Sequence, residues 1–247
     1  MQRITIVSSI KSFFDKNAHK HAYHHDPTIY RPIISHMQSY NKDCLKILDF
    51  GCGDGAFIKC LINDGIEAAY YGTDISQTMI NLAKQNISNS MVEFFIADGF
   101  NLPIKPEQKF DLIHLDSVLH HIIGNTKSKS NRLVNELLEM LFNRLDKNGS
   151  LIVEELYYDS YIFRELTSFL IFYGLKFFNF THIDISKFLK EYSMGLEVNF
   201  FSNRDLINIL KAYGEPHLIK CKPAKVPTLY KLFFLKKLGN ISYVIGK

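Results

Sequence analysis

Residues that could hold a small ligand gather in one stretch, KILDFGCGDGAF, at residues 46–57. Asp49 stands two residues before Gly51, the first of three glycines at alternate positions. Gly51 and Gly53 allow the backbone to turn tightly and to approach a ligand closely. A helix expected from about Gly55 would direct its N–H groups at the same place, an arrangement that usually binds anions. The carboxylate of Asp49 therefore needs an explanation, because it would repel an anionic ligand.

Two kinds of ligand use such a loop. Gly51-x-Gly53-x-x-Ala56 satisfies the G-x-G-x-x-G/A pattern of dinucleotide-binding proteins, and Asp74 follows at nearly the spacing of a ribose-binding acid. The alternative ligand is S-adenosylmethionine, which has no phosphate and carries a sulfonium and an ammonium group. Asp49 favours this second ligand, since a carboxylate attracts both cations and repels a pyrophosphate.

Short apolar runs that alternate with amphipathic stretches must position these acids. Strands are expected at residues 46–50, 68–75, 91–98, 110–116, 150–156, 217–222 and 241–246. Helical patterns follow the first, second and fourth of these and recur at 202–213, and a loop follows the third. This alternation favours a parallel sheet covered on both faces. Asp49, Asp74 and Asp98 end three successive strands, so we expect them to converge on one crevice at the carboxyl edge of the sheet. Asp54 and Asp116 fit the simpler role of turn formers or helix N-caps.

Four segments resemble the motifs of class I S-adenosylmethionine-dependent methyltransferases in order and spacing, beginning with LDFGCGDG. YYGTDIS resembles the second-strand motif, which implies that Asp74 accepts from the ribose hydroxyls and that Ile75 packs on the adenine. FFIADGFNLP resembles the third, which implies that Asp98 receives the adenine amino group and that Gly99 offers a backbone N–H. FDLIHLDSVLHHI resembles the fourth, which implies that Leu115 lies near the amino-acid end of the cofactor.

The resemblance covers residues 45–156 well and the remaining elements loosely. It implies an α/β, Rossmann-like three-layer sandwich whose seven-stranded sheet is mostly parallel with an antiparallel last strand. It also implies that the cofactor is S-adenosylmethionine and the product S-adenosylhomocysteine. We expect residues 1–44 to form an N-terminal helical lid and residues 45–247 to form the methyltransferase domain.

His120 and His121 follow the fourth strand, at the mouth of the expected crevice. Methyl transfer needs donor and acceptor to be aligned in a dry pocket, and it needs a base only when the acceptor must lose a proton. Histidine titrates in the right range for that base, so both are candidate catalytic residues. A purely structural role, such as a hydrogen bond to a backbone carbonyl, is the alternative. The His-rich run at 19–26 is too irregularly spaced for a metal site, and we expect no metal.

An insertion at about 157–201 does not belong to the alternation and holds 14 aromatic residues among its 45. Helical spacing within it predicts a helix, through Ile162, Leu166, Phe169, Tyr173 and Phe177. We expect this insertion to cap the acceptor site, and its aromatic side chains would suit a flat or greasy small molecule. The candidates are Tyr157, Tyr158, Tyr161, Phe169, Phe172 and Tyr173. The alternative is that these side chains form the core of the cap itself.

The sequence argues against several classes of methyl acceptor. The fourth motif reads LDSV rather than the N/D-P-P-Y/F of adenine and glutamine methyltransferases, and no Pro-Cys pair is present for cytosine chemistry. The function expected is methyl transfer to a small, apolar or aromatic metabolite. One alternative is a tRNA-modifying methyltransferase, because VLHHI also resembles that group and the net charge is +4. Another is a catalytically silent subunit that binds the cofactor and acts as a partner.

Composition agrees with an ordinary cytoplasmic protein. Hydrophobic residues make up 47% and charged residues 22% of the 247. The four cysteines form no C-x-x-C pair, and no apolar run is long enough to span a bilayer, so we expect reduced thiols and no transmembrane segment. Residues 220–239 contain six lysines and no acid. That segment is expected to be a solvated edge, with contact to a phosphate backbone or an anionic membrane surface as alternatives.

Overall fold

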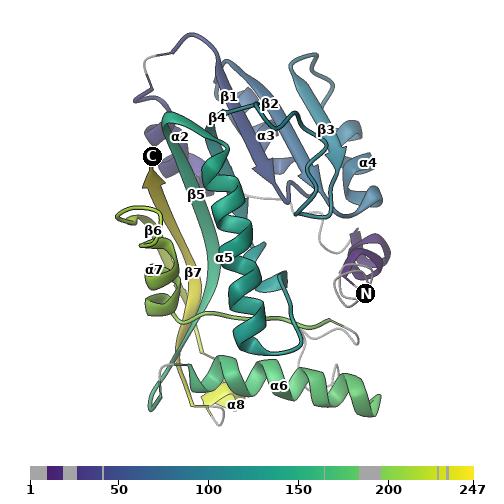
Figure 1. The fold of residues 1–247 in the computed structure, drawn as a ribbon, viewed down its shortest axis with the longest axis vertical. Coiled ribbons are helices and arrows are strands. Elements are labelled where there is room, and N and C mark those ends of the chain that lie inside the picture. Colours follow the sequence, from purple (N-terminus) through teal and green to yellow (C-terminus); the bar gives the residue numbers. More distant parts are fainter. Residues whose placement is uncertain are drawn as a thin grey trace.

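A single seven-stranded sheet forms the centre of the molecule, in the order β3-β2-β1-β4-β5-β7-β6 (Figure 1). The computed structural model describes residues 10–18, 27–40, 42–163, 165–183, 196–226, 228–231 and 234–247. The strands are β1 (Leu45–Phe50), β2 (Ala68–Asp74), β3 (Val92–Ile96), β4 (Phe110–Asp116), β5 (Leu145–Ser160), β6 (His217–Ala224) and β7 (Leu235–Gly246).

Helices connect and cover these strands. They are η1 (Pro27–Tyr30), α2 (Arg31–Met37), α3 (Ala56–Asn63), α4 (Gln77–Asn86), η2 (Leu119–His121), α5 (Lys127–Asn143), α6 (Leu166–Thr181), α7 (Asn203–Leu210) and α8 (Thr228–Lys231). Residues 10–18 are also helical. The His-rich run at 19–26 lies outside the described residues, so our expectation for it stays a prediction.

The topology places a switch point between β1 and β4. β1 pairs in parallel with β2 on one side and with β4 on the other, so the connections leave it in opposite directions. In open sheets of this kind, ligands bind beyond the carboxyl ends of the strands at such a point. β7 runs antiparallel to both of its neighbours, β5 and β6. The predicted fold class is confirmed, including the antiparallel last strand.

Alternating side chains divide the core between the two faces of the sheet. Leu48 and Ile113 point to the face covered by α5 and α7, where they pack with Leu137. Ile47 and Leu112 point to the opposite face and pack under η1, α2 and α3. Three helices begin where the sequence offers a hydroxyl cap: the side-chain oxygens of Ser76, Thr126 and Ser202 accept backbone N–H groups of α4, α5 and α7.

Strands β5 and β7 extend further than predicted. The sequence indicated 150–156 and 241–246, whereas the antiparallel pairing continues to Ser160 opposite Leu235. Lysine and glycine, which make up most of Lys236–Gly239, form strands poorly. The sequence pattern therefore does not indicate a strand in this part of β7. Pairing with β5 continues to Leu235 and pairing with β6 begins at Leu238, so tertiary contacts impose the extended backbone. The insertion expected from residue 157 therefore leaves the sheet only after residue 160, and the helix predicted inside it is α6.

None of the helices in the described part of the chain has the length and apolarity needed to cross a membrane. The helix α6, for instance, has 16 residues.

Gly72 in β2 offers a test of the packing between the sheet and its edge. A methyl group at this position would lie 2.5 Å from Cδ1 of Phe94, a ring carbon in the neighbouring strand β3. We expect Gly72→Ala to lower the free energy of unfolding by about 1–3 kcal/mol, because an overpacked side chain must move. Urea denaturation measures this.

Gly174 in α6 is the matched control, since a methyl group there meets no atom within 4 Å. Gly174→Ala should raise the free energy of unfolding by about 0.5–1 kcal/mol, the ordinary gain for a helix interior. Equal effects of the two substitutions would contradict the close approach of β2 to the Phe94 ring.

Candidate functional site

The glycine loop after β1 has the backbone geometry that its glycines were expected to provide. Gly51 and Gly53 have φ angles of 80° and 53°, in the left-handed region that side chains other than glycine rarely adopt. The Gly51 N–H donates to the carbonyl of Thr73, at 2.7 Å. The Gly53 N–H donates to the Asp74 carboxylate, at 3.0 Å. The loop after β1 is thereby fixed to the end of β2.

Asp74 lies at the carboxyl end of β2 and organises that corner. One of its oxygens accepts from Gly53, and the other accepts from the Ser76 N–H at 2.8 Å. Enough protein surrounds the carboxylate that desolvation raises its pKa to about 6, although the two backbone hydrogen bonds oppose the change. The group therefore changes charge just below neutral pH.

The other sequence-predicted residues lie near this edge with different exposures. Ile75 is half-buried directly after β2, and Gly99 is buried with a φ of 89°. Asp98 is exposed, and its Oδ1 accepts from the N–H groups of Phe100 and Asn101. This is the turn-forming role that the sequence suggested for Asp54 and Asp116. Leu115 is fully buried in the core of the sheet, so only its backbone faces the strand ends.

Asp49 has a partner that the sequence argument did not foresee. Its carboxylate is 3% exposed and lies 2.8 Å from Nδ1 of His114 on β4, whose Nε2 lies 3.2 Å from Glu154 on β5. Burial lowers the pKa of His114, but the hydrogen bonds and charges of the two carboxylates outweigh it and raise the pKa to about 10. Asp49 thus faces a cation inside the protein, and a cationic ligand is not needed to explain its presence.

This buried chain joins four strands. Glu154 also accepts from the hydroxyl of Ser242 on β7, and the His114 pairing lowers its pKa despite the cost of burial. The ring of Phe57 stacks on the His114 ring, at 3.8 Å between centroids. His114 lies in the segment LIHL, which is otherwise apolar. A histidine within such a strand was the one feature of the sequence that could have indicated its role.

His120 and His121 lie on η2, directly after a strained turn. Ser117 has a φ of 58°, an uncommon conformation for a residue with a side chain, and it turns the chain from β4 into η2. His120 is 5% exposed, and its Nδ1 lies 2.8 Å from Glu155 on β5. Glu155 also accepts from the N–H of Leu119. Sequence reasoning missed Glu155, because two adjacent glutamates in the strand segment SLIVEEL do not by themselves indicate a functional role.

Aromatic rings surround the two histidines. The ring of Phe200 lies 5.3 Å from that of His120, and Tyr158 stacks on Phe200 at 4.3 Å. Phe14, from the helical residues 10–18, meets the His121 ring edge-on at 5.1 Å. Of the aromatic residues proposed for the acceptor site, Tyr158 lies closest to this arrangement.

Lys127 and Asn199 hold the Phe200 segment in place. The N–H of Asn199 donates to the carbonyl of His120 at 2.8 Å. The ammonium group of Lys127 donates to the Asn199 side chain and to the carbonyl of Phe200, at 2.9 and 3.0 Å. Burial lowers the pKa of this ammonium group. These bonds fix residues 199–200 over η2.

The remaining proposed cap residues are divided between core and surface. Tyr157 belongs to the main core of the sheet, and Phe172 is fully buried on α6. Tyr161, Phe169 and Tyr173 are exposed by 60%, 49% and 38%. Neither expectation, an acceptor lining or a cap core, accounts for these three.

Residues 10–18 cross the same edge of the sheet. Asp15 accepts from the hydroxyl of Ser76 at 2.6 Å and from the N–H of Thr78 at 3.3 Å, at the start of α4. With Phe14 against His121, this helix contacts both the β2 end and the η2 end of the edge. The expectation that residues 1–44 form a lid stays a prediction.

The loop geometry fits a nucleoside with an amino-acid tail. A side chain at Gly53 would meet no atom within 4 Å, so the loop is open on its outer side. The Thr73 hydroxyl, beside Asp74, is buried and has no hydrogen-bond partner in the described residues. The Asp74 carboxylate accepts only one bond at each oxygen, so it can still accept from ligand hydroxyls.

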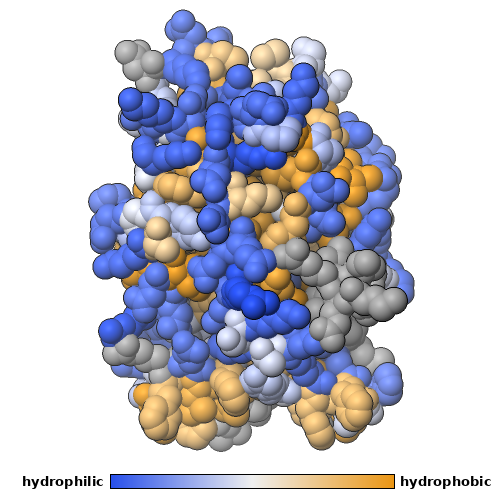
Figure 2. Space-filling model, viewed as in Figure 1, coloured by the Kyte–Doolittle hydropathy of each residue, from blue (hydrophilic) through white to orange (hydrophobic). Residues whose placement is uncertain are grey.

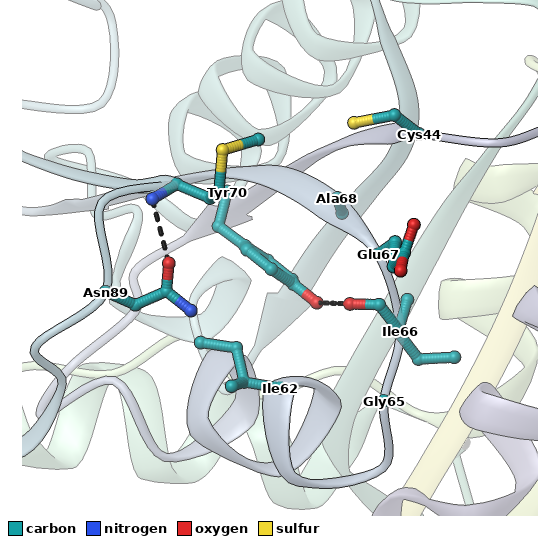
Figure 3. Close-up of a pocket in the computed structure, with 9 residues that line it drawn as sticks. Cys44, Ile62, Gly65, Ile66, Glu67, Ala68, Tyr70 and Asn89 are labelled. Atoms are coloured by element: carbon teal, nitrogen blue, oxygen red, sulfur yellow. Dashed lines mark hydrogen bonds between the residues drawn. The ribbon is translucent and has the colours of Figure 1, made fainter.

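A separate hollow of about 440 Å³ lies at the opposite, amino-terminal ends of β1 and β2. Ile62, Gly65, Tyr70 and Asn89 line it, and the Tyr70 hydroxyl donates to the carbonyl of Ile66 (Figure 3). None of the predicted cofactor-binding or catalytic residues line this hollow. The strand order favours a functional site at the other edge of the sheet.

Part of the chain is similar to known methyltransferases. The model of a methyltransferase domain family matches residues 47–142. The phosphoethanolamine N-methyltransferase of Plasmodium falciparum is 30% identical over 112 residues, which are 44% of this chain and 38% of that protein. The chain therefore spans well under half the length of this curated relative.

Solved structures share the fold at low identity. A SAM-dependent methyltransferase from Anabaena variabilis aligns with a TM-score of 0.59 and 15% identity, covering 98% of this chain and 94% of that one. The phosphoethanolamine N-methyltransferase 2 of Haemonchus contortus, solved with phosphomonomethylethanolamine and S-adenosylhomocysteine, aligns with a TM-score of 0.55 and 13% identity, covering 87% and 51%. Residues 47–142 therefore match a methyltransferase domain family, and the chain shares its fold with these solved methyltransferases.

The His114 chain predicts a stability that depends on pH. The pKa of His114 is about 10 in the folded protein against an ordinary value of 6.5, so protonation favours the folded state. This contribution is complete below pH 6.5 and is lost as the pH rises toward 10. His114→Gln should cost about 3–5 kcal/mol at neutral pH, because two buried carboxylates lose their cation.

Urea denaturation of both proteins between pH 6 and pH 10 tests this, and the difference between them should shrink as the pH rises. His217→Gln, at an exposed position on β6, is the control and should leave the pH profile unchanged. A difference that stays constant up to pH 10 would mean that His114 is neutral in the folded protein.

Proposed function

We propose that this chain transfers a methyl group from S-adenosylmethionine to a small, apolar or aromatic metabolite bound beside His120. The observation that carries the proposal is the buried His120–Glu155 pair, at 2.8 Å, set among aromatic rings where the chain leaves the carboxyl end of β4. The similarity to a phosphoethanolamine N-methyltransferase, whose name denotes a small-molecule acceptor, supports this class over RNA.

The cofactor would lie over the glycine loop. Gly51 and Gly53 offer the close approach, Asp74 would accept from ribose hydroxyls, and Ile75 would pack on the adenine. When bound, S-adenosylmethionine supplies a methyl group activated by its sulfonium. Asp98 and Gly99 would contact the base from the loop after β3, while Asp49 and Leu115 would contribute through the strand ends that they form.

Glu155 would set the proton position on His120. An ionised carboxylate can only accept hydrogen bonds, so Nδ1 of His120 must carry a proton to make the 2.8 Å contact. The other ring nitrogen, Nε2, is then the one able to take a proton from an acceptor hydroxyl or amine. The neighbouring rings of Phe200, His121 and Phe14 would exclude water and hold a flat acceptor.

The test of this function is incubation with methyl-labelled donor and fractionated cell extract. Label in the small-molecule organic phase is expected. His120→Gln should lower the rate by about 10²–10⁴-fold while S-adenosylhomocysteine still raises the melting temperature, because proton removal and not cofactor binding is impaired. His217→Gln, at an exposed histidine, should keep full activity.

Three results would overturn the proposal. Label in RNA would favour a tRNA-modifying enzyme, with binding that weakens steeply with salt. No label in any fraction, with the cofactor still bound, would favour a silent partner subunit. Full activity of His120→Gln would remove the base from the mechanism.

Asp74 provides a separate test of the cofactor site. Asp74→Ala should weaken S-adenosylhomocysteine binding by about 1–3 kcal/mol, because ligand hydroxyls lose their acceptor. Because the pKa of Asp74 is about 6, the affinity of the unmodified protein should also fall as the pH drops from 7 to 5. Isothermal titration measures both effects.

The exposed Asp64, at the end of α3, is the control. Asp64→Ala should bind as tightly as the unmodified protein at every pH. If Asp74→Ala keeps its affinity, the second motif is wrongly assigned.

A further inference from the structure

Helix α6 exposes aromatic side chains along one side, and the ring contacts given for them are with other rings of the same helix. Phe169, Tyr173, Phe177 and Phe180 are exposed by 49%, 38%, 58% and 84%. Their spacing places them within an arc of about 80° on one side of the helix. We call these four residues the aromatic face. The opposite side, with Phe172 and Leu175, is buried.

A helix that is apolar all round is normally enclosed by protein or by lipid. The one charged residue of α6, Lys176, bonds to Glu197 at 2.5 Å and so leaves no free charge on the helix. The turn before the helix continues the same character, with Ile162 and Phe163 exposed by 60% and 72%. Figure 2 shows hydrophobic side chains along the lower edge of the molecule, where α6 lies in Figure 1.

Lysines border this surface. Lys225, Lys231, Lys236 and Lys237 are all exposed, and we call them the lysine rim. Lys236 and Lys237 lie near the start of β7, shortly after Phe234, whose carbonyl accepts from the N–H of Tyr161 in the turn before α6. Residues 220–239 contain no acid, and Asp159 on β5 is paired across the ribbon with Lys237.

We propose that the aromatic face and the lysine rim dock this protein on the surface of an anionic phospholipid bilayer. Exposed aromatic rings insert at the level of the lipid headgroups, and nearby lysines are attracted by the negative surface potential. The proposal concerns a peripheral contact with one leaflet. It rests on α6 and the lysines alone and does not depend on which acceptor is methylated.

Charge favours this occupant over the others. In a symmetric dimer built on α6, the same patch of both copies would meet, and the eight lysines of two rims would be brought together with the two Asp159 carboxylates opposite Lys237. Single-stranded RNA would need cations that follow its backbone between the stacking rings. On α6 the only lysine is already paired with Glu197, and the free lysines lie to one side.

The chain has no tryptophan, which allows a single reporter to be placed. Phe180→Trp puts one tryptophan on the aromatic face, and Met91→Trp puts one on an exposed position before β3, at the other end of the sheet. With full-length protein and vesicles containing phosphatidylserine, the emission of the first should shift to the blue and be quenched by brominated lipid. The emission of the second should not change.

Sedimentation with vesicles tests the two parts of the surface. Binding to phosphatidylserine-containing vesicles should exceed binding to pure phosphatidylcholine by roughly tenfold or more. Phe177→Ser with Phe180→Ser, and separately Lys236→Gln with Lys237→Gln, should each weaken binding by roughly tenfold. The control pair, Lys105→Gln with Lys147→Gln, removes two exposed lysines elsewhere and should leave binding unchanged.

Several outcomes would overturn the proposal. They are no binding to anionic vesicles, equal binding to neutral ones, or binding that neither test pair weakens. A dimer in solution that Phe177→Ser with Phe180→Ser dissociates, without vesicle binding, would show that a second copy covers the face. Binding of single-stranded RNA in place of vesicles would assign the surface to nucleic acid.

Discussion

A protonated imidazole between two carboxylates stands at the centre of this molecule. His114 reaches Asp49 on one neighbouring strand and Glu154 on the other, and Glu154 reaches a fourth strand through Ser242. All of these groups are buried at the carboxyl ends of the central strands, where parallel sheets bind their ligands. The edge that carries the glycine loop is therefore held by charge as well as by backbone hydrogen bonds. Three hydrophobic side chains could pack there, but they would lack the directional hydrogen bonds that hold the strand ends in register.

Two adjacent glutamates on β5 divide the site between the faces of the sheet. Side chains alternate along a strand, so Glu154 points to His114 on one face while Glu155 points to His120 on the other. The first pair stabilises the edge under the cofactor loop. The second orients the histidine proposed as the base. A shift of β5 by a single residue would exchange these roles, which ties the register of the strand to the chemistry of the site.

The sequence predicted the sheet and the cofactor loop because both depend on local patterns. Glycines with positive φ, an acid at each strand end and alternating apolar runs are all visible without a structure. His114 and Glu155 were missed because their importance arises from partners 65 and 35 residues away, which no local pattern indicates. The extension of β7 through Lys236 and Lys237 was missed for the same reason, since pairing with neighbours overrides the low strand preference of that segment. The sequence indicates the position of Asp49 at the end of a strand. It does not indicate its partner, because the cation that Asp49 faces is the side chain of His114.

The antiparallel ribbon of β5 and β7 continues past the last strand pairing of the parallel sheet and ends at Ser160. Ser160 is bonded to Thr167 at the start of α6, at 2.7 Å. From Glu155 to Ser160 the strand advances about 17 Å, and pairing with β7 continues over that length, with a register shift between Asp159 and Ser160. The ribbon therefore separates α6 from the reacting centre by a set length. Any surface that α6 rests against is held at that distance from His120.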